Sequence, residues 1–370
     1  MKDLSNISVV LPSLDPDEKL TAVIDGLLEY GFSDIILVND GSKPENLHYF
    51  EDAAARHPEI HLLHHPVNRG KGAALKTAFT WFLENRPDGM GVVTVDGDNQ
   101  HHPEDTRACA EHMAEHHRVV LGVRDFSLPQ VPFRSRSGNR ITSLVFKIFC
   151  GMTISDTQTG LRAIPTRELK ILNTIAGDRF EYETNMLLAM KSHGMAFDEV
   201  KIRTVYIEEN KSSHFRAIQD SWRIYKLILA HFFKYTLSSV ISSVVEVALV
   251  AILNLLCRNT LTGFLLTAVP TVVSRGLSSL FNFYLNKQLV FHSQVSTGRA
   301  MLRYYMLAIP QMIAQLLLTH GAYTLLGLGE EQTIARVAVY VLVMGVLFIA
   351  SYMIQQRWVF AKKEDKENEE

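Results

Sequence analysis

Four long apolar segments near the end of the 370-residue chain constrain its fold more than any other feature. They lie at residues 235–257, 263–286, 304–329 and 337–354. Among Asp, Glu, Lys and Arg, only Glu246 and Arg275 occur in them. A helix needs about 20 residues to cross the hydrocarbon core of a bilayer. Buried helices of a large soluble domain are the alternative, but four in succession favour four membrane spans.

Positive charge is distributed unevenly among the loops that flank these segments. The cations gather before the first segment, between the second and third, and after the fourth, at Lys234, Lys287, Arg299, Arg303, Arg357, Lys362 and Lys363. The loop between the third and fourth contains Glu330 and Glu331 instead. The positive-inside rule therefore predicts a multi-pass protein of the cell membrane with both termini in the cytoplasm. Residues 1–10 lack the apolar core of a signal peptide, which agrees with a cytoplasmic N-terminus.

The apolar region also contains an internal repeat. Residues 282–291 (NFYLNKQLVF) and 351–360 (SYMIQQRWVF) place polar residues, a cation and Val-Phe at matching offsets. This similarity indicates two helical hairpins in a parallel arrangement. A cationic, aromatic stop at a membrane interface would produce part of the same pattern.

Up to about residue 210, short apolar runs alternate with amphipathic stretches. Strands are predicted at residues 7–11, 34–39, 60–64, 91–95 and 119–123. One helix is predicted to begin at Asp15 as N-cap, with Pro16 at the first helical position and Glu18 completing a capping box. A second is predicted to follow residues 68–72. This alternation predicts a parallel sheet covered by helices, which binds ligands beyond the carboxyl ends of its strands.

Acidic residues follow two of these strands. Asp96 and Asp98 lie two residues apart on a turn, where both could face one divalent cation that also contacts diphosphate oxygens, and Gln100 could add a ligand. An ordinary Asp-Gly turn is the alternative. Asp40 could accept a hydrogen bond from a base or ribose, or could form an Asx turn or a helix cap.

The glycine-rich segment Asn68–Gly72 precedes a helix, so its amides and Lys71 could face an anion. It lacks the spacer and the Lys-Ser/Thr ending of a P-loop. No Gly-x-Gly-x-x-Gly follows the first strand either. A nucleotide triphosphatase and a dinucleotide site therefore have little support.

Arginines gather in the next part of the chain, at Arg124, Arg134, Arg136, Arg140 and Arg162. Planar guanidinium groups suit a phosphate, whereas a basic face attracted to anionic lipid is the alternative. Lysine and arginine number 37 against 39 aspartates and glutamates, which argues against nucleic-acid binding by bulk charge. The three cysteines are too few and too widely spaced for a disulfide framework.

Five of these segments, in this order, resemble a known family: Val9–Ser13, Val38–Ser42, Asn68–Gly72, Val95–His101 and Asp156–Arg162. They are similar to those of family 2 glycosyltransferases of the GT-A fold, specifically polyprenyl-phosphate glycosyltransferases similar to dolichyl-phosphate mannose synthase. Residues 232–360, with Ser274–Phe283, resemble the four-span GtrA-like domain often fused to them.

The resemblance implies an α/β GT-A catalytic domain with a mostly parallel, Rossmann-like sheet, followed by an all-α domain of four transmembrane helices. The expected boundaries are 1–210 for the catalytic domain, 211–232 for an interfacial amphipathic helix or linker, 233–361 for the membrane domain and 362–370 for a charged cytoplasmic tail. The catalytic domain is expected on the cytoplasmic face.

The resemblance also implies roles for individual residues. The nucleotide sugar would be held by Pro12, Asp17, Asp40, Lys71 and Asp96. Mg²⁺ or Mn²⁺ would be bound by Asp96, Asp98 and Gln100. The acceptor phosphate would be held by Arg124, Arg134 or Arg136, and Ser137, and Asp98 belongs to the catalytic set. A loop that closes over donor and lipid would contain Ser212, Ser213, His214 and Arg216.

The expected reaction is inverting, metal-dependent transfer of a hexose from a nucleotide diphosphate sugar, for which UDP-glucose is the first candidate, to undecaprenyl or another polyprenyl phosphate. It would serve modification of a cell-envelope glycan. A lipid phosphate already carries negative charge, so no general base is assigned. The membrane domain would anchor the enzyme or help to translocate lipid, and a homo-oligomer formed through it is compatible with the sequence.

Two alternatives remain open at this stage. The acceptor could be a growing glycan, but synthases of that type carry Gln-x-x-Arg-Trp after the catalytic domain, and Gln356-Arg357-Trp358 lies after the fourth span without that spacing. The chain could instead be a lipid-sugar transporter or scaffold, against which the Asp96-Gly-Asp98 turn and the arginines argue.

Overall fold

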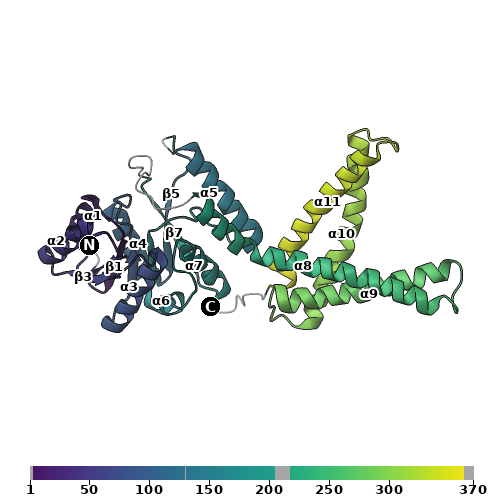
Figure 1. The fold of residues 1–370 in the computed structure, drawn as a ribbon, viewed down its shortest axis with the longest axis horizontal. Helices are drawn as coiled ribbons and strands as arrows, with labels where there is room; N and C mark the ends of the chain where they lie inside the picture. Colours follow the sequence, from purple (N-terminus) through teal and green to yellow (C-terminus); the bar gives the residue numbers. More distant parts are fainter. Residues whose placement is uncertain (1–2, 130, 205–216, 362–370) are drawn as a thin grey trace. The chain divides into compact units, whose positions relative to one another are not determined.

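The computed structural model describes residues 3–129, 131–204 and 217–361 (Figure 1). The chain divides into two compact units, Met1–Leu227 and Ile228–Glu370, which we call the sheet unit and the membrane unit. The predicted closing loop with Ser212, Ser213, His214 and Arg216 lies outside the described residues, as does the whole of the predicted tail.

The sheet unit is built on seven strands in the order β3-β2-β1-β4-β6-β5-β7. Their bounds are β1 (Ile7–Ser13), β2 (Ile35–Asn39), β3 (Ile60–His64), β4 (Gly91–Thr94), β5 (Val119–Arg124), β6 (Arg162–Pro165) and β7 (Phe197–Ile202). All neighbouring pairs are parallel except those of β6, which is antiparallel to β4 and β5. The predicted mostly parallel α/β sheet is therefore confirmed.

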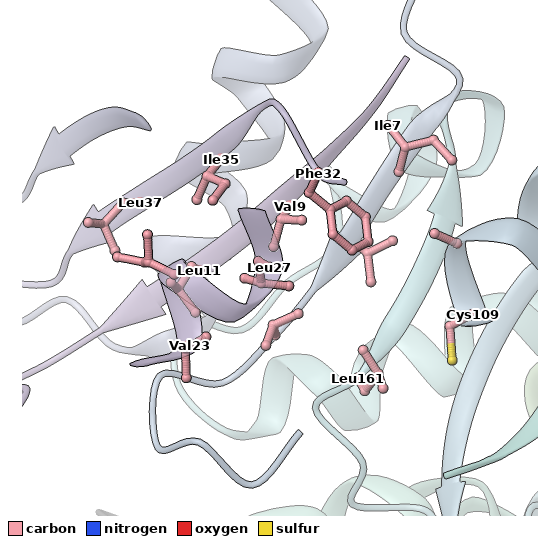
Figure 2. Packing of buried hydrophobic residues seen from close by; sticks show 14 of the residues in the cluster. Ile7, Val9, Leu11, Val23, Leu27, Phe32, Ile35, Leu37, Cys109 and Leu161 are labelled. Atoms are coloured by element: carbon pink, nitrogen blue, oxygen red, sulfur yellow. The ribbon is translucent and has the colours of Figure 1, made fainter. Parts of the chain in front are cut away.

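Helices connect these strands, as the alternating pattern predicts. They are α1 (Lys19–Glu29), η1 (Pro44–Asn46), α2 (Leu47–Arg56), α3 (Lys71–Asn85), α4 (Pro103–His116), α5 (Phe133–Val145), the π-helical turn η2 (Phe146–Cys150), α6 (Thr166–Leu172) and α7 (Glu181–Ser192). Within β1, alternate side chains pack into one core cluster, and Figure 2 shows Val9 and Leu11 beside Val23 and Leu27 of α1. Val10, which points to the opposite face, is also buried, because a parallel sheet is covered on both sides.

The predicted start of the first helix is wrong. Asp15 has a φ of 49° and its carboxylate accepts hydrogen bonds from the Lys43 amide and from Asn46, so it joins two loops instead of capping a helix. Helix α1 begins at Lys19, whose amide donates to the Asp17 carboxylate at 3.0 Å. The contacts of Asp15 with residues about 30 positions away in sequence therefore replace the local capping interaction that the pattern predicts.

The membrane unit is helical, and α8 (Ala217–Cys257) enters it from the sheet unit without interruption. It continues with α9 (Phe264–Leu285), η4 (Asn286–Val290), α10 (Thr297–Leu325), α11 (Thr333–Ile354) and η5 (Gln355–Val359). Among the described residues, four helical segments are long and apolar enough to cross a membrane: Ile228–Cys257, Phe264–Val290, Thr297–Leu325 and Thr333–Val359. The four predicted spans are thus found as helices, and the first begins at Ile228, before the predicted start at residue 235.

The two predicted repeat segments adopt the same local structure. Each ends in a five-residue π-helical turn, η4 or η5, that begins at Asn286 or Gln355. These two residues occupy matching positions and hydrogen-bond to each other, from Asn286 Nδ2 to Gln355 Oε1, at 3.3 Å. Ser238 of α8 donates to Asn286, and Gln355 donates to Tyr235 of α8. The repeat therefore forms a buried polar junction that joins α8 to the ends of α9 and α11.

The two charged residues of the predicted apolar segments, Glu246 and Arg275, pair with each other. Arg275 Nη1 donates to both carboxylate oxygens of Glu246, at 2.9 and 3.0 Å, and Ser278 donates to the same carboxylate. The predicted pairing of Glu246 with Arg275 is thereby confirmed. It lowers the cost of holding either charge at membrane depth.

Candidate functional site

Charged side chains from three elements meet beyond the carboxyl end of β4. Lys71, the first residue of α3, places its Nζ 2.7 Å from Oδ1 of Asp96 and 3.0 Å from Oε1 of Glu183 on α7. His101 lies 3.5 Å from the other oxygen of Asp96. The turn at Gly97 lies against Ser13, at the end of β1, so this cluster sits at the edge of the sheet where ligands bind in such folds.

The electrostatics of this cluster follow from its burial and its charges. Burial alone raises the pKa of Asp96, but attraction to Lys71 and the contact with His101 outweigh it, so the pKa is held well below its ordinary value. Burial alone lowers the pKa of Lys71, yet attraction to Asp96 and Glu183 raises it overall. Burial raises the pKa of Asp98, and the negative charge of Asp96 adds to that effect.

This donor set fits a divalent cation. Mg²⁺ and ions like it are commonly bound by one or two carboxylates, with water and substrate phosphates as the other ligands. Burial is the main reason that the pKa of Asp98 is raised, and repulsion by the carboxylate of Asp96 adds to it; a cation between the two carboxylates would relieve that repulsion. The described residues contain no group of three or more His, Cys, Asp or Glu side chains arranged for a metal. Gln100 donates its backbone amide to Asp98 at 3.1 Å.

The backbone packs tightly against Asp96. Gly160, just before β6, leaves no room for a side chain: a methyl group there would overlap Oδ2 of Asp96 and lie 2.8 Å from its Cγ. The carbonyl of Gly160 is fixed in place because it accepts a hydrogen bond from buried Thr94 at 2.7 Å. Glycine at this position therefore sets where the Asp96 carboxylate can lie.

Asp40 is engaged inside the protein. Its carboxylate accepts hydrogen bonds from the backbone amides of Arg69 and Gly70, at 2.9 and 2.8 Å, and lies 2.7 Å from Nδ1 of His65. The residue is buried. Asp40 therefore holds the glycine-rich segment before α3. Its predicted role in nucleotide binding stays a prediction. Gly70 has a φ of 102°, a backbone conformation that L side chains rarely adopt.

The other two residues predicted to bind nucleotide lie near the same edge of the sheet. Pro12 lies on β1, paired with Val38 of β2. Asp17 is exposed and pairs with Lys19 at 3.0 Å, so its described contacts belong to the start of α1. No ligand contact tests either role, and both stay predictions.

Among the predicted phosphate-binding arginines, Arg124 is already paired. At the end of β5, its Nε donates to Asp156 at 2.7 Å and its Nη2 to the same carboxylate at 3.1 Å. Asp156 is fully buried. Arg162, which the sequence groups with these arginines, is buried too and donates to the carbonyls of Thr159 and Glu183.

The remaining predicted residues lie on α5. Arg136 donates from Nη2 to the Leu128 carbonyl at 2.8 Å, and its Nε is buried without a hydrogen-bond partner among the described residues. Ser137 is half-buried on the same helix. Arg134 belongs to α5, but its side chain lies outside the described part of the chain. The structure thus brings Lys71, Asp96 and Asp98 together, whereas Arg124 pairs with Asp156 and Arg136 donates to the Leu128 carbonyl.

Sequence reasoning missed two residues that the structure places at these sites. Glu183 lies within α7, 112 positions beyond Lys71 and outside every motif, so only the fold brings them together. His65 follows β3 directly and bonds both Asp40 and Thr77. Its position after a strand, like that of Asp40, was the one signal by which sequence could have found it.

Comparison with known proteins agrees with this architecture. Residues 8–172 match the model of glycosyl transferase family 2, and residues 234–360 match that of the GtrA/DPMS transmembrane domain. The chain joins a family 2 glycosyltransferase to a GtrA/DPMS transmembrane domain. The predicted resemblance is therefore confirmed, as is the prediction that the protein is a glycosyltransferase. This glycosyltransferase is a membrane protein by its matched domain and its four apolar helices.

Three relatives match the glycosyltransferase over most of their own length. An uncharacterized protein of Methanocaldococcus jannaschii is 28% identical over 61% of this chain and 93% of its own. The UDP-N-acetylglucosamine–dolichyl-phosphate N-acetylglucosaminyltransferase of Methanococcus voltae is 25% identical over 55% and 86%. The undecaprenyl-phosphate mannosyltransferase of Micrococcus luteus is 25% identical over 56% and 86%.

Proposed function

We propose that this glycosyltransferase moves a hexose from a nucleotide diphosphate sugar to a polyprenyl phosphate at the cytoplasmic face of the cell membrane. The observation that carries the proposal is the meeting of Lys71, Asp96 and Asp98 beyond the carboxyl end of β4. Two of the named relatives act on dolichyl or undecaprenyl phosphate, which supports this class of acceptor. Their sugars differ, so the relatives leave the sugar open, and UDP-glucose stays our first candidate.

The residues of this cluster suit a diphosphate leaving group. Asp96 and Asp98 would hold Mg²⁺ or Mn²⁺, and such an ion supplies positive charge that stabilises a departing nucleoside diphosphate. Lys71, at the first turn of α3, adds a cation beside Asp96, and the amides of that turn favour anions as well. Glu183 keeps Lys71 charged and directed toward Asp96.

The chemistry needs no general base. A phosphate oxygen of the lipid attacks the anomeric carbon, the bond from that carbon to the nucleoside diphosphate breaks, and the configuration inverts. The lipid phosphate is already ionised near neutral pH, so no proton has to be removed from it. The chain's own contribution is to position both reactants, for which guanidinium groups such as those of Arg134 or Arg136 are suited.

The orientation in the membrane follows from the distribution of cations. Lys234 lies near the end of the first span that follows the sheet unit, and Arg357 lies near the C-terminal end of the fourth span. Lys287 and Arg303 lie near the ends of the second and third spans that are connected to each other. The positive-inside rule places these ends in the cytoplasm. The sheet unit would then meet cytoplasmic nucleotide sugars and the phosphate of a lipid in the inner leaflet.

A transfer assay with the full-length protein tests the proposal. The protein is reconstituted in vesicles that contain undecaprenyl phosphate and is incubated with radiolabelled UDP-glucose, UDP-N-acetylglucosamine or GDP-mannose, with Mn²⁺ or EDTA. We expect one donor to label the organic phase, and EDTA to abolish the labelling.

The outcomes separate the competing functions. Label in a water-soluble polymer would show that the acceptor is a growing glycan. No transfer from any donor, with the protein folded and Mn²⁺ bound, would contradict the proposed enzyme and leave a transporter or scaffold. The Asp98→Ala variant, prepared in the same way, is the control for activity that comes from a contaminant.

A further inference from the structure

One arginine lies inside the sheet, next to the candidate site. Arg162 begins β6, where it pairs with Thr94 of β4 on one side and with Leu121 of β5 on the other. Its side chain is 2% exposed, and among the described residues its Nη2 has no hydrogen-bond partner. A guanidinium buried in this way is not presented to the phosphate of a substrate, so its role has to lie within the protein.

Stability alone does not explain a buried guanidinium at this place. Taking a charge out of water costs free energy, and hydrogen bonds to carbonyls offset that cost only in part. Burial lowers the pKa of Arg162. The negative charges of Glu183, Asp156 and Asp96 oppose that effect. An apolar side chain would fill the place between β4 and β5 at a lower cost, but it has no N–H groups to donate.

One of these N–H groups holds the segment that packs against Asp96. Arg162 Nε donates to the carbonyl of Thr159 at 3.1 Å. That carbonyl belongs to the planar peptide group that leads into Gly160. The carbonyl of Gly160 is held in turn by Thr94. Both peptide groups that flank Gly160 are therefore fixed, and Gly160 is the residue that packs directly against the Asp96 carboxylate.

A second N–H group of the same guanidinium holds α7. Arg162 Nη1 donates to the carbonyl of Glu183 at 2.8 Å. The carboxylate of Glu183 lies 3.0 Å from the Nζ of Lys71. Lys71 also pairs with Asp96. One side chain thus fixes the backbone behind both acids that face Lys71, Glu183 directly and Asp96 through Gly160.

We propose that Arg162 is a positioning residue, which joins the Thr159–Gly160 peptide to α7 and so holds Asp96 and Glu183 in the places that Lys71 and a divalent cation require. The proposal rests on the proposed function, because the cation site is part of that function. The two carbonyls belong to different elements, and a rigid, forked donor joins them. The ammonium group of a lysine is a point charge and does not reproduce this fork.

Two replacements of Arg162 separate positioning from charge. Arg162→Lys keeps the positive charge and loses the fork, whereas Arg162→Met loses both. The full-length variants are purified in detergent micelles, and their affinity for Mn²⁺ alone is measured well below their Tm from the EPR signal of the free ion. We expect both variants to bind Mn²⁺ about 10-fold or more weakly than the parent, as happens when a group that orients metal ligands is removed.

Leu27→Ala is the matched control for a loss of stability. Leu27 is buried in the core cluster on α1, and its side chain has no polar group. Its truncation should lower Tm, because it leaves a cavity, but should not change the Mn²⁺ affinity of the folded protein. A purely structural role of Arg162 would give this same result, a lower Tm with parental Mn²⁺ affinity.

The outcomes that overturn the proposal differ from those that overturn the proposed function. Parental or tighter Mn²⁺ binding by Arg162→Met would overturn it. Parental binding by Arg162→Lys would also overturn it, because the charge alone would then suffice. A parent protein that binds no Mn²⁺ would refute the cation site of the proposed function, and this proposal with it. If either variant does not fold, Arg162→Gln, which keeps an amide donor on a neutral side chain, takes its place.

Discussion

The contact between Gly160 and Asp96 predicts a variant that keeps its fold and loses its activity. In Gly160→Ala, the added methyl group would overlap Oδ2 of Asp96 and lie 2.8 Å from Cγ and 3.0 Å from Oδ1. Ordinary carbon contacts are about 3.5 Å or longer, so the carboxylate has to move by about 1 Å. The backbone cannot yield instead, because Thr94 holds the Gly160 carbonyl and β6 pairs with β4 on the next residues.

A shift of this size has different consequences for stability and for function. The moving atoms are the end of one side chain, so we expect a cost at the lower end of the range for overpacking, about 1 kcal/mol, and a fall in Tm of about 2 to 4 °C. A displacement of about 1 Å in a reacting site costs about 100-fold in rate. The shift also separates Asp96 from Lys71, now 2.7 Å away.

Three measurements test the reasoning. Thermal unfolding of the Gly160→Ala variant should stay close to that of the parent, Mn²⁺ affinity measured by the EPR signal of the free ion should fall, and sugar transfer should fall about 100-fold. Gly138→Ala is the matched control, because the residue is inside α5 and, among the described residues, no atom other than those of its chain neighbours and its own helix backbone lies within 4 Å of the added carbon. Unchanged Mn²⁺ affinity together with full transfer activity in Gly160→Ala would refute the placement of Asp96 in the site.

Three further variants probe other parts of the structure. Asp98→Ala should abolish turnover with little change in Tm, and near-normal rates would remove its role with the metal. Asn286→Leu should destabilise the membrane unit by about 1 to 3 kcal/mol, because buried Gln355 loses a hydrogen-bond partner. Unfolding in mixed micelles measures this loss. Adding Gln355→Leu to the Asn286→Leu variant should cost much less stability than Gln355→Leu costs in the parent protein. Asp156→Asn should lower the free energy of unfolding by about 3 to 5 kcal/mol, because Arg124 loses its buried carboxylate partner. Chemical denaturation measures this change, and a loss below about 1 kcal/mol would contradict the reasoning.

Local patterns in the sequence were sufficient for most of the architecture. The five predicted strands and the four spans follow from apolar runs, whose length and periodicity are set by burial alone. The antiparallel β6 could not be found in this way. Its sequence, Arg162–Pro165, contains a buried arginine and only four residues, and it is a strand because β4 and β5 leave a gap that it fills.

The candidate site was predicted less completely than the fold, because its charge pairs also depend on tertiary packing. Motifs identify residues at strand ends, and Asp96 and Lys71 do meet. They do not identify which charges neutralise one another. Glu183 for Lys71 and Asp156 for Arg124 are partners that only the packed structure supplies, and each changes what its cation is able to bind.

The structure distinguishes between two explanations of the membrane repeat. A cationic aromatic stop explains Val-Phe and the cation at matching offsets, but it gives no reason for Asn286 and Gln355 to be polar, since residues at a stop need only face water. Both are buried, and every amide hydrogen of the two side chains is donated: Asn286 to Asn282 and Gln355, and Gln355 to Tyr235 and Ser351. Two equivalent turns that meet through equivalent residues are what a duplicated hairpin produces when its copies pack about a shared axis. The repeat is therefore better explained by duplication than by the demands of the interface.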